Sequence, residues 1–256
     1  MKKSINLYFN NKINTKQKLL EIKNSGYEEF FTGIFDGEET LSLTEQIDYA
    51  KSIGLGLTMI HCAYYDLKLD SFWEEGSDGE EVKNEYIRQI SKCGTLTSNF
   101  VIHLHLTQNY KTSRIGLHRI NELLKECEKY NVNLAVENLL KEDDIKYIFS
   151  NISHPLLKIC YDCGHQNFAT PDFDLMKNYG KYVSVLHIHD NNGILDEHKI
   201  IGEGTINIEN LAKNLSEFPN LTLASEIKYP NEDYRLVIKR NFEALTNLEK
   251  LVYDKI

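Results

Sequence analysis

The stretch that decides the fold is INELLKECEKYNVNLAVE, residues 120–137. Its apolar residues first recur at the spacing i, i+3, i+4 and i+7, which places them on one face of a helix. They are Ile120, Leu123, Leu124 and Cys127. The apolar segment Asn133–Glu137 follows directly and is typical of a buried strand. The stretch therefore predicts a helix followed by a strand.

The same alternation of strand-like and amphipathic segments runs along the whole chain. The expected strands are Ile5–Phe9, Glu29–Ile34, Gly56–Cys62, Phe100–Leu106, Asn133–Glu137, Leu157–Asp162, Val183–His189 and Leu221–Ile227. Alternating strands and helices indicate a parallel sheet with crossover helices. No G-x-G-x-x-G follows the first strand, so a dinucleotide-binding sheet lacks its main signal. We predict an α/β fold, a (β/α)8 TIM barrel, as a single domain over residues 1–256.

The composition limits the partners and the compartment. The formal net charge is −9, so the chain has no general attraction to nucleic acid, which is bound through Lys and Arg. The five cysteines are odd in number and irregular in spacing, which argues against a disulfide framework and favours the cytoplasm. No run of about 18 apolar residues occurs, and no membrane span is expected. A homo-oligomer is compatible with the sequence, which leaves the oligomeric state open.

Most of the nine histidines gather where the predicted strands end. Those at or just after a strand end are His61, His103, His105, His165, His187, His189 and His198. Active sites of barrels lie at the C-terminal ends of the strands. A single histidine there is more often a satisfied polar residue than a ligand, but Glu137 and Glu226 each end an apolar strand. Two buried carboxylates repel one another unless a cation lies between them, which predicts a divalent metal site.

Two short motifs strengthen the prediction. Asp162-Cys163-Gly164-His165 places two kinds of ligand three residues apart on a strand-to-loop turn. His187 and His189 alternate on a strand, so both point the same way, and one could serve to orient the other. The side chain of Cys163 should point away from that of Asp162, and no G-x-S-x-G motif supports a serine hydrolase.

These residues resemble the xylose isomerase-like barrel superfamily, which contains sugar and sugar-phosphate isomerases and epimerases together with endonuclease IV. The resemblance is strongest over His187-Ile188-His189-Asp190-Asn191 and over Asp196-x-His198-x-x-Ile201-Gly202-Glu203-Gly204. It implies a core metal site made of Glu137, Asp162, His187 and Glu226. The endonuclease branch has a three-zinc cluster, and the positions that resemble its further ligands are His61, His103, His165, Asp196 and His198.

The resemblance implies a divalent-metal-dependent isomerase or epimerase of a sugar or sugar phosphate. Glu137 and Glu226 would transfer a proton through a metal-stabilised enediolate, and His165 would contact the substrate. His189 and Lys228 are further candidate substrate-binding residues, and Lys141 and Lys199 are additional candidates for a phosphate or a hydroxyl group. One to three ions are expected, Zn or Mn before Co or Mg.

The alternative is a zinc-dependent phosphodiesterase that resembles endonuclease IV, an apurinic-site endonuclease. The complete set of candidate ligands supports it. The acidic balance and the presence of only five arginines argue against DNA as a partner.

Overall fold

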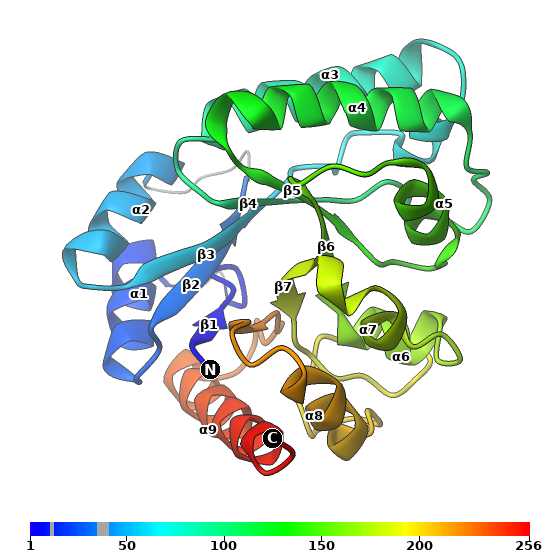
Figure 1. The fold of residues 1–256 in the computed structure, drawn as a ribbon. Coiled ribbons are helices and arrows are strands. Elements are labelled where there is room, and N and C mark those ends of the chain that lie inside the picture. Colours follow the sequence, from blue (N-terminus) through cyan, green and yellow to red (C-terminus); the bar gives the residue numbers. More distant parts are fainter. Residues whose placement is uncertain (11–12, 35–40) are drawn as a thin grey trace.

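The computed structural model describes residues 1–10, 13–34 and 41–256. Within these ranges the strands lie at the centre and the helices surround them (Figure 1). The strands are β1 (Lys3–Ile5), β2 (Glu29–Gly33), β3 (Gly56–His61), β4 (Asn99–Ile102), β5 (Asn133–Glu137), β6 (Leu157–Asp162), β7 (Val183–His187) and β8 (Leu223–Ser225). All the pairings between them are parallel.

The strands close into a ring. β2 to β7 form one sheet in sequence order, and β1 pairs with β8. Single parallel bridges connect the two sheets, from Asn6 to Phe31 on one side and from Ile188 to Ser225 on the other. The predicted TIM barrel is therefore confirmed.

The strand β8 is shorter than the predicted segment Leu221–Ile227, and β1 begins earlier than the predicted segment Ile5–Phe9 and shares only Ile5 with it. The Asn6 side chain causes part of this difference, because it takes the place of a backbone partner. Its amide nitrogen donates to the Ile227 carbonyl at 2.9 Å, and its oxygen accepts from the Ile227 amide at 3.1 Å. β4 and β7 likewise stop before the predicted ends at Leu106 and His189, since the chain turns there into the loops of the barrel mouth.

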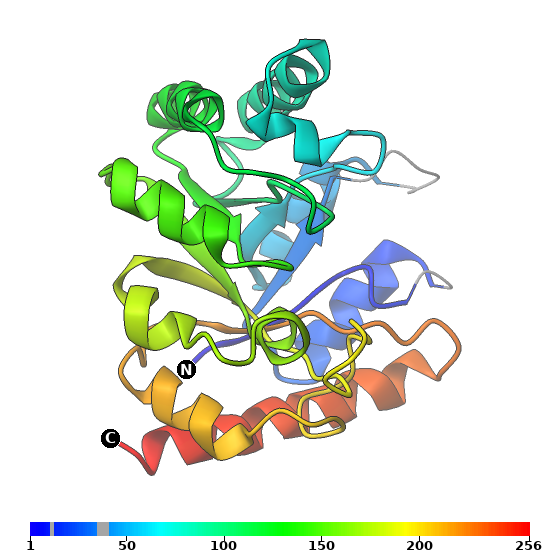
Figure 2. The ribbon, with the colours of Figure 1, turned by 90° about the vertical axis from the view of Figure 1, so that its right-hand side faces the viewer.

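The helices follow the amphipathic segments. They are α1 (Thr15–Asn24), α2 (Leu43–Ser52), α3 (Ser77–Cys93), α4 (Arg114–Tyr130), α5 (Asp143–Asn151), α6 (Cys163–Ala169), α7 (Leu175–Tyr179), α8 (Ile208–Ser216) and α9 (Tyr234–Tyr253), with 3-10 turns η1 (Leu69–Trp73) and η2 (Gly180–Tyr182). Figure 2 shows α9 along the lower side of the barrel, where the Met1 amino group lies 2.5 Å from Glu249. Within the described ranges, no helix is long and apolar enough to cross a membrane.

The core has two layers. The larger one packs the helices against the outside of the strands. The smaller one fills the barrel and takes one residue from each of the strands β2 to β8: Phe31, Met59, Val101, Ala135, Cys160, Val185 and Ala224. Because side chains alternate along a strand, the residue two positions after each of these faces the same way, toward the C-terminal mouth.

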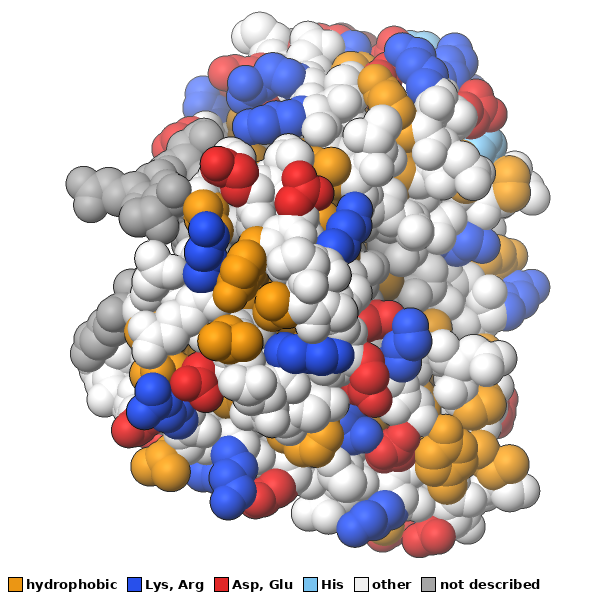
Figure 3. All heavy atoms as spheres, turned by 90° about the vertical axis from the view of Figure 1, so that its left-hand side faces the viewer, with side chains coloured by type: hydrophobic (Ala, Val, Ile, Leu, Met, Phe, Trp, Pro, Cys, Tyr) orange, Lys and Arg blue, Asp and Glu red, His pale blue; other side chains and the backbone are white. Residues whose placement is uncertain are grey.

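The flank that carries α1 and α2 bears a mixed surface. Figure 3 shows basic and acidic side chains interspersed over this face, with no large area of one sign. Such a face offers a nucleic acid backbone no continuous basic surface.

A close contact between α4 and the loop after β3 provides a test of the packing. A methyl group at Gly116 would overlap the indole ring of Trp73, which is buried and donates to the Leu104 carbonyl at 3.1 Å. We expect Gly116→Ala to lower the free energy of unfolding by about 1–3 kcal/mol, because overpacking outweighs the gain in helix propensity. Urea denaturation measures this effect. The exposed Lys125→Ala on the same helix should stay within about 0.5 kcal/mol of wild type, and equal losses in both variants would contradict the packing argument.

Candidate metal centre

The candidate site is a direct result of strand alternation. Six consecutive strands, β3 to β8, each place an ionisable residue two positions after their interior residue. These residues are His61, His103, Glu137, Asp162, His187 and Glu226. They therefore converge above the apolar interior of the barrel.

The central group consists of Glu137, Asp162, His187 and Glu226, which offer ligand atoms that all lie within 4.8 Å of one another. His187 is at its middle. Its Nδ1 lies 3.0 Å from a Glu226 oxygen, 3.2 Å from a Glu137 oxygen and 3.7 Å from an Asp162 oxygen. These are the four residues that the sequence predicted for the core metal.

Two further groups flank the centre. On one side, His61 and His103 place their Nε2 atoms 3.2 Å apart, and both contact Oε2 of Glu137, at 3.2 and 3.0 Å. On the other side, a carboxylate oxygen of Asp196 lies 3.0 Å from His198 and 3.4 Å from His165. The structure thus brings together all the candidate ligands named from the sequence.

The two glutamates are ionised because positive charge lies beside them. Burial alone would raise the pKa of Glu137, but His187 and His103 hold it well below its usual range. Burial acts in the same direction on Glu226, and again the His187 imidazole outweighs it and lowers the pKa. Without a cation in the centre, the histidines must supply the compensating charge.

The pKa values of most of the histidines shift upward, in the opposite direction to those of the glutamates. The pKa values of His61, His165 and His187 are raised well above the usual range by nearby acceptors and carboxylates, although burial acts to lower them. The pKa of His198 rises to about 9 in the same way, whereas burial prevails at His103 and lowers its pKa. Metal ligation requires neutral imidazoles, so metal binding would release protons and strengthen as the pH rises toward these values.

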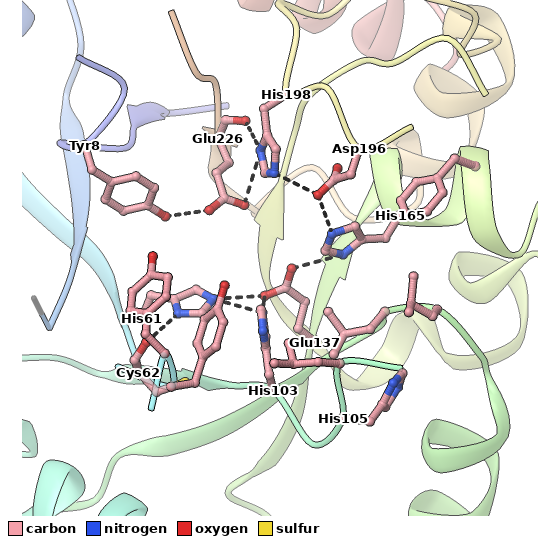
Figure 4. A pocket seen from close by; sticks show the side chains of 16 residues that line it. Tyr8, His61, Cys62, His103, His105, Glu137, His165, Asp196, His198 and Glu226 are labelled. Carbon is pink, nitrogen blue, oxygen red and sulfur yellow. Dashed lines mark hydrogen bonds and ion pairs between the residues drawn. The ribbon is translucent and has the colours of Figure 1, made fainter. Parts of the chain in front are cut away.

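Glu137 and Glu226 of the central group line a cavity of about 250 Å³, whereas Asp162 and His187 are absent from its described lining. Figure 4 shows Tyr8 and Glu226 on one side of it, with His61, His103 and Glu137 on the other. The cavity also receives Asp196, His198 and His165 from the loops that follow β6 and β7, together with apolar side chains from the loops that follow β3, β4 and β5. Two carboxylates from opposite parts of the barrel therefore face one small chamber.

Two residues predicted to bind substrate lie elsewhere. His189 is fully buried behind the centre, where its Nε2 lies 3.0 Å from the Asp162 carboxylate, and it is absent from the described residues that line the cavity. It lies beside Asp162 rather than in the cavity, and with Asp162 and His165 it forms a further group whose ligand atoms could hold a metal ion. Lys228 is exposed and is also absent from the described lining. His165 does reach the cavity, as predicted.

Sequence reasoning missed Tyr8. Its hydroxyl group donates to Oε1 of Glu226 at 2.5 Å, and burial followed by the Glu226 charge raises the pKa of the phenol well above its usual range. Tyr8 lies inside the predicted first strand, and its place near the mouth end of that segment was the signal that could have identified it.

Cys160 and Cys163, which lie beside the site, do not offer a nucleophile. All five cysteines are free and buried. Burial raises the pKa of Cys160 to about 12, and it raises that of Cys163 further. The Cys163 thiol contacts the His189 carbonyl at 3.3 Å, away from the cavity floor. Both thiols therefore stay protonated at neutral pH.

The donor set fits a divalent ion. Nitrogen and carboxylate oxygen ligands suit Zn and Mn, and the central group offers both kinds in a buried position. Neither ring nitrogen of His187 makes a hydrogen bond within the described ranges, although three carboxylates surround Nδ1. A buried nitrogen without a partner is costly, and a metal ion at the common point would satisfy it.

Comparison with known proteins agrees with the geometry. A family model described as xylose isomerase-like TIM barrel matches residues 27–248. An uncharacterized protein of Methanocaldococcus jannaschii, MJ1614, is 29% identical over 194 residues, which cover 71% of this chain and 74% of that protein. D-psicose 3-epimerase from Clostridium cellulolyticum H10 superposes with a TM-score of 0.79 at 14% identity, over 98% of this chain and 99% of that one.

The IolI protein with a bound zinc atom superposes with a TM-score of 0.76 at 18% identity, over 100% of this chain and 99% of that one. At such low identities, the two solved structures establish the shared fold alone.

Asp162 allows a test of the metal assignment. We expect Asp162→Asn to weaken binding of Zn or Mn by more than the roughly 10–100-fold that loss of an outer partner costs, because the central group loses a charged ligand. Asparagine keeps an oxygen that can accept from the His165 amide, as Asp162 does at 2.7 Å, so α6 keeps its N-cap. Metal content after dialysis measures the effect, and circular dichroism checks the fold. Full occupancy in this variant, equal to that of the exposed control Asp48→Asn, would refute the assignment.

Proposed function

Because the chain belongs to the xylose isomerase-like TIM barrel family, we propose that it is a metal-dependent isomerase or epimerase of a sugar. The observation that supports the proposal best is the pair Glu137 and Glu226. They reach one small cavity from β5 and from the end of β8, with His187 between them. Epimerisation next to a carbonyl needs groups that remove and return a proton on opposite faces of one carbon, and isomerisation needs a group that moves the proton to the neighbouring carbon.

Glu137, Asp162, His187 and Glu226 would hold the ion, with Zn or Mn as the preferred metals. A bound divalent ion supplies Lewis acidity, which polarises a carbonyl and acidifies the adjacent C–H bond. The chain itself supplies the proton acceptors and their orientation within a small cavity.

The two glutamates are not equivalent. Both oxygens of Glu137 are engaged: His61 and His103 contact Oε2, and His165 and His187 lie 3.2 Å from Oε1. Glu226 has fewer partners in the described part of the site, with Tyr8 at Oε1 and His187 at Oε2. We assign the first proton abstraction to Glu226, and the return of a proton on the opposite face to Glu137.

Tyr8 and His165 have supporting roles. The Tyr8 hydroxyl donates to Oε1 of Glu226 and fixes the direction of that carboxylate. His165 faces the cavity beside Glu137 and Asp196, and its raised pKa makes it a hydrogen-bond donor at both nitrogens. It would bind a substrate hydroxyl group or the oxygen that gains negative charge during proton transfer.

Glutamine substitution separates the chemistry from the fold. Glutamine keeps the volume of the side chain but accepts no proton at neutral pH, and loss of a general base costs about 10²–10⁴-fold in rate. We expect both Glu226→Gln and Glu137→Gln to lose turnover, and each to lose deuterium exchange on one face of the reacting carbon, measured in D2O with a ketose found by screening. The exposed Glu243→Gln on α9 is the matched control and should exchange like wild type.

Two outcomes would contradict this mechanism. Exchange at the wild-type rate in both site variants would exclude the glutamates as bases. Conversion of a sugar without any exchange from solvent would instead support a hydride shift between neighbouring carbons.

A second candidate function is zinc-dependent phosphodiester hydrolysis, as in an endonuclease IV-like enzyme. The observation that favours it is the pair of flanking groups, one around His61 and His103 and the other around Asp196 and His198. Several ions bound side by side supply hydroxide at neutral pH and neutralise a phosphate.

Metal stoichiometry and cleavage assays distinguish the two candidates. The isomerase proposal predicts one tightly held ion per chain by elemental analysis and no cleavage of a duplex with an abasic site. Three tightly held ions together with chelator-sensitive cleavage would reverse the order of the candidates. Weak duplex binding is expected in either case at about physiological salt, because the chain has a net charge of −9.

A further inference from the structure

The apolar side chains of the cavity gather on one side of it, where Glu137 and His165 also reach it from β5 and α6. Apolar side chains come from four consecutive segments, those after β3, β4, β5 and β6, and these residues are Tyr64, Tyr65, Leu106, Leu139, Leu140 and Phe168. The opposite side follows β7, β8 and β1, and it contributes Asp196, His198, Glu226 and the Tyr8 hydroxyl group. We call the apolar side chains the apolar arc and the groups of the opposite side the polar arc.

The histidines beneath the apolar arc present few free polar atoms to a ligand. The Nε2 atoms of His61 and His103 are turned toward Glu137. His105 is fully buried, with Nδ1 3.2 Å from the Thr107 carbonyl and Nε2 3.4 Å from the Asp144 carboxylate. These nitrogens face other protein groups, so the arc presents mainly apolar side chains to a ligand.

The described residues that line the cavity include no lysine and no arginine. The lysines considered from the sequence are directed elsewhere. Lys141 lies over the Tyr110 ring at 5.3 Å, and Lys199 pairs with Glu197 at 2.8 Å. Phosphate recognition normally uses such cations or clustered N–H donors. Among the described lining residues, a phosphate could therefore meet only histidines and a bound metal ion, and no lysine or arginine.

The apolar arc continues to the surface. Tyr65 is 71% exposed and Leu106 is 45% exposed, although both line the cavity. Tyr65 stacks on Tyr64 with ring centroids 4.9 Å apart and an interplanar angle of 24°. Large apolar side chains that extend from a cavity floor to its rim indicate contact with an apolar part of a ligand.

We propose that the substrate is an uncharged sugar derivative that carries a ketone on its sugar ring and a flat apolar group, such as an aryl glycoside with a ring ketone, and not a sugar phosphate. A simple glycoside lacks the ketone and serves as a binding probe that does not react. The sugar ring lies against the polar arc, where Glu226 and His198 face it, and the apolar group lies against Leu106 and the stacked tyrosines. This inference rests on the proposed function and names the substrate class of the same site.

Matched ligand pairs test the proposal. Calorimetry on the Mn-loaded protein compares methyl and phenyl β-glycosides of glucose, galactose and mannose with the corresponding hexose 6-phosphates. We expect at least one phenyl glycoside to bind about tenfold tighter than its methyl partner, or about 1.4 kcal/mol. The hexose phosphates should bind no tighter than the neutral sugars.

Variants of two partly exposed residues test whether the apolar arc causes the preference for phenyl glycosides over methyl glycosides. Leu106→Ser and Tyr65→Ser should each bring the phenyl-to-methyl affinity ratio close to one. Both side chains are partly exposed, so the fold should tolerate the change. Leu236→Ser is the control, because Leu236 is 61% exposed on α9 and is absent from the described lining of the cavity.

The outcomes separate this inference from the proposed function. Equal affinities for phenyl and methyl glycosides, or tighter binding of hexose phosphates, would overturn the substrate class while sugars remain the ligands. A phenyl preference that survives in both arc variants would also overturn it. Failure of every sugar, neutral, aryl or phosphorylated, to bind would overturn both the inference and the proposed function.

Discussion

The buried carboxylate of Glu137 is the constraint on which the rest of the site depends. It is only 1% exposed, and a carboxylate in that position is stable only beside compensating positive charge. Four imidazoles from β3, β4, β7 and the start of α6 surround it, those of His61, His103, His187 and His165. Because the Glu137 carboxylate is charged and buried, four separate segments each place an imidazole beside it at the barrel mouth.

Strand alternation explains why sequence could predict the centre. Cys160 and Asp162 are two residues apart, as are Val185 and His187, so an apolar interior residue and a polar mouth residue share one face of each strand. An apolar run that ends in Glu, Asp or His is visible in the sequence without any knowledge of the loops. The predicted metal ligands accordingly lie together, and the closed barrel follows from eight repeats of one unit.

The other features of the site depend on contacts that cannot be predicted from the alternation of side chains along a strand. His189 would share the direction of His187 if β7 continued, but the strand ends at His187. The His189 ring instead packs against Gly164, where any Cβ would overlap it, and reaches Asp162 from behind. Tyr8 escaped prediction for a related reason. Its role depends on a hydroxyl group that meets Glu226 across 218 positions of sequence, a pairing that only the closed ring creates.

The apolar interior of the barrel and the charged floor depend on one another. Tyr8 packs against the interior cluster, with its ring centroid 6.1 Å from that of Phe31. Burial, followed by the Glu226 charge, raises the pKa of Tyr8 well above its usual range, which favours the protonated phenol that donates to Oε1 of Glu226. The interior, which touches no reacting atom, thus helps to define the direction in which Glu226 faces its substrate.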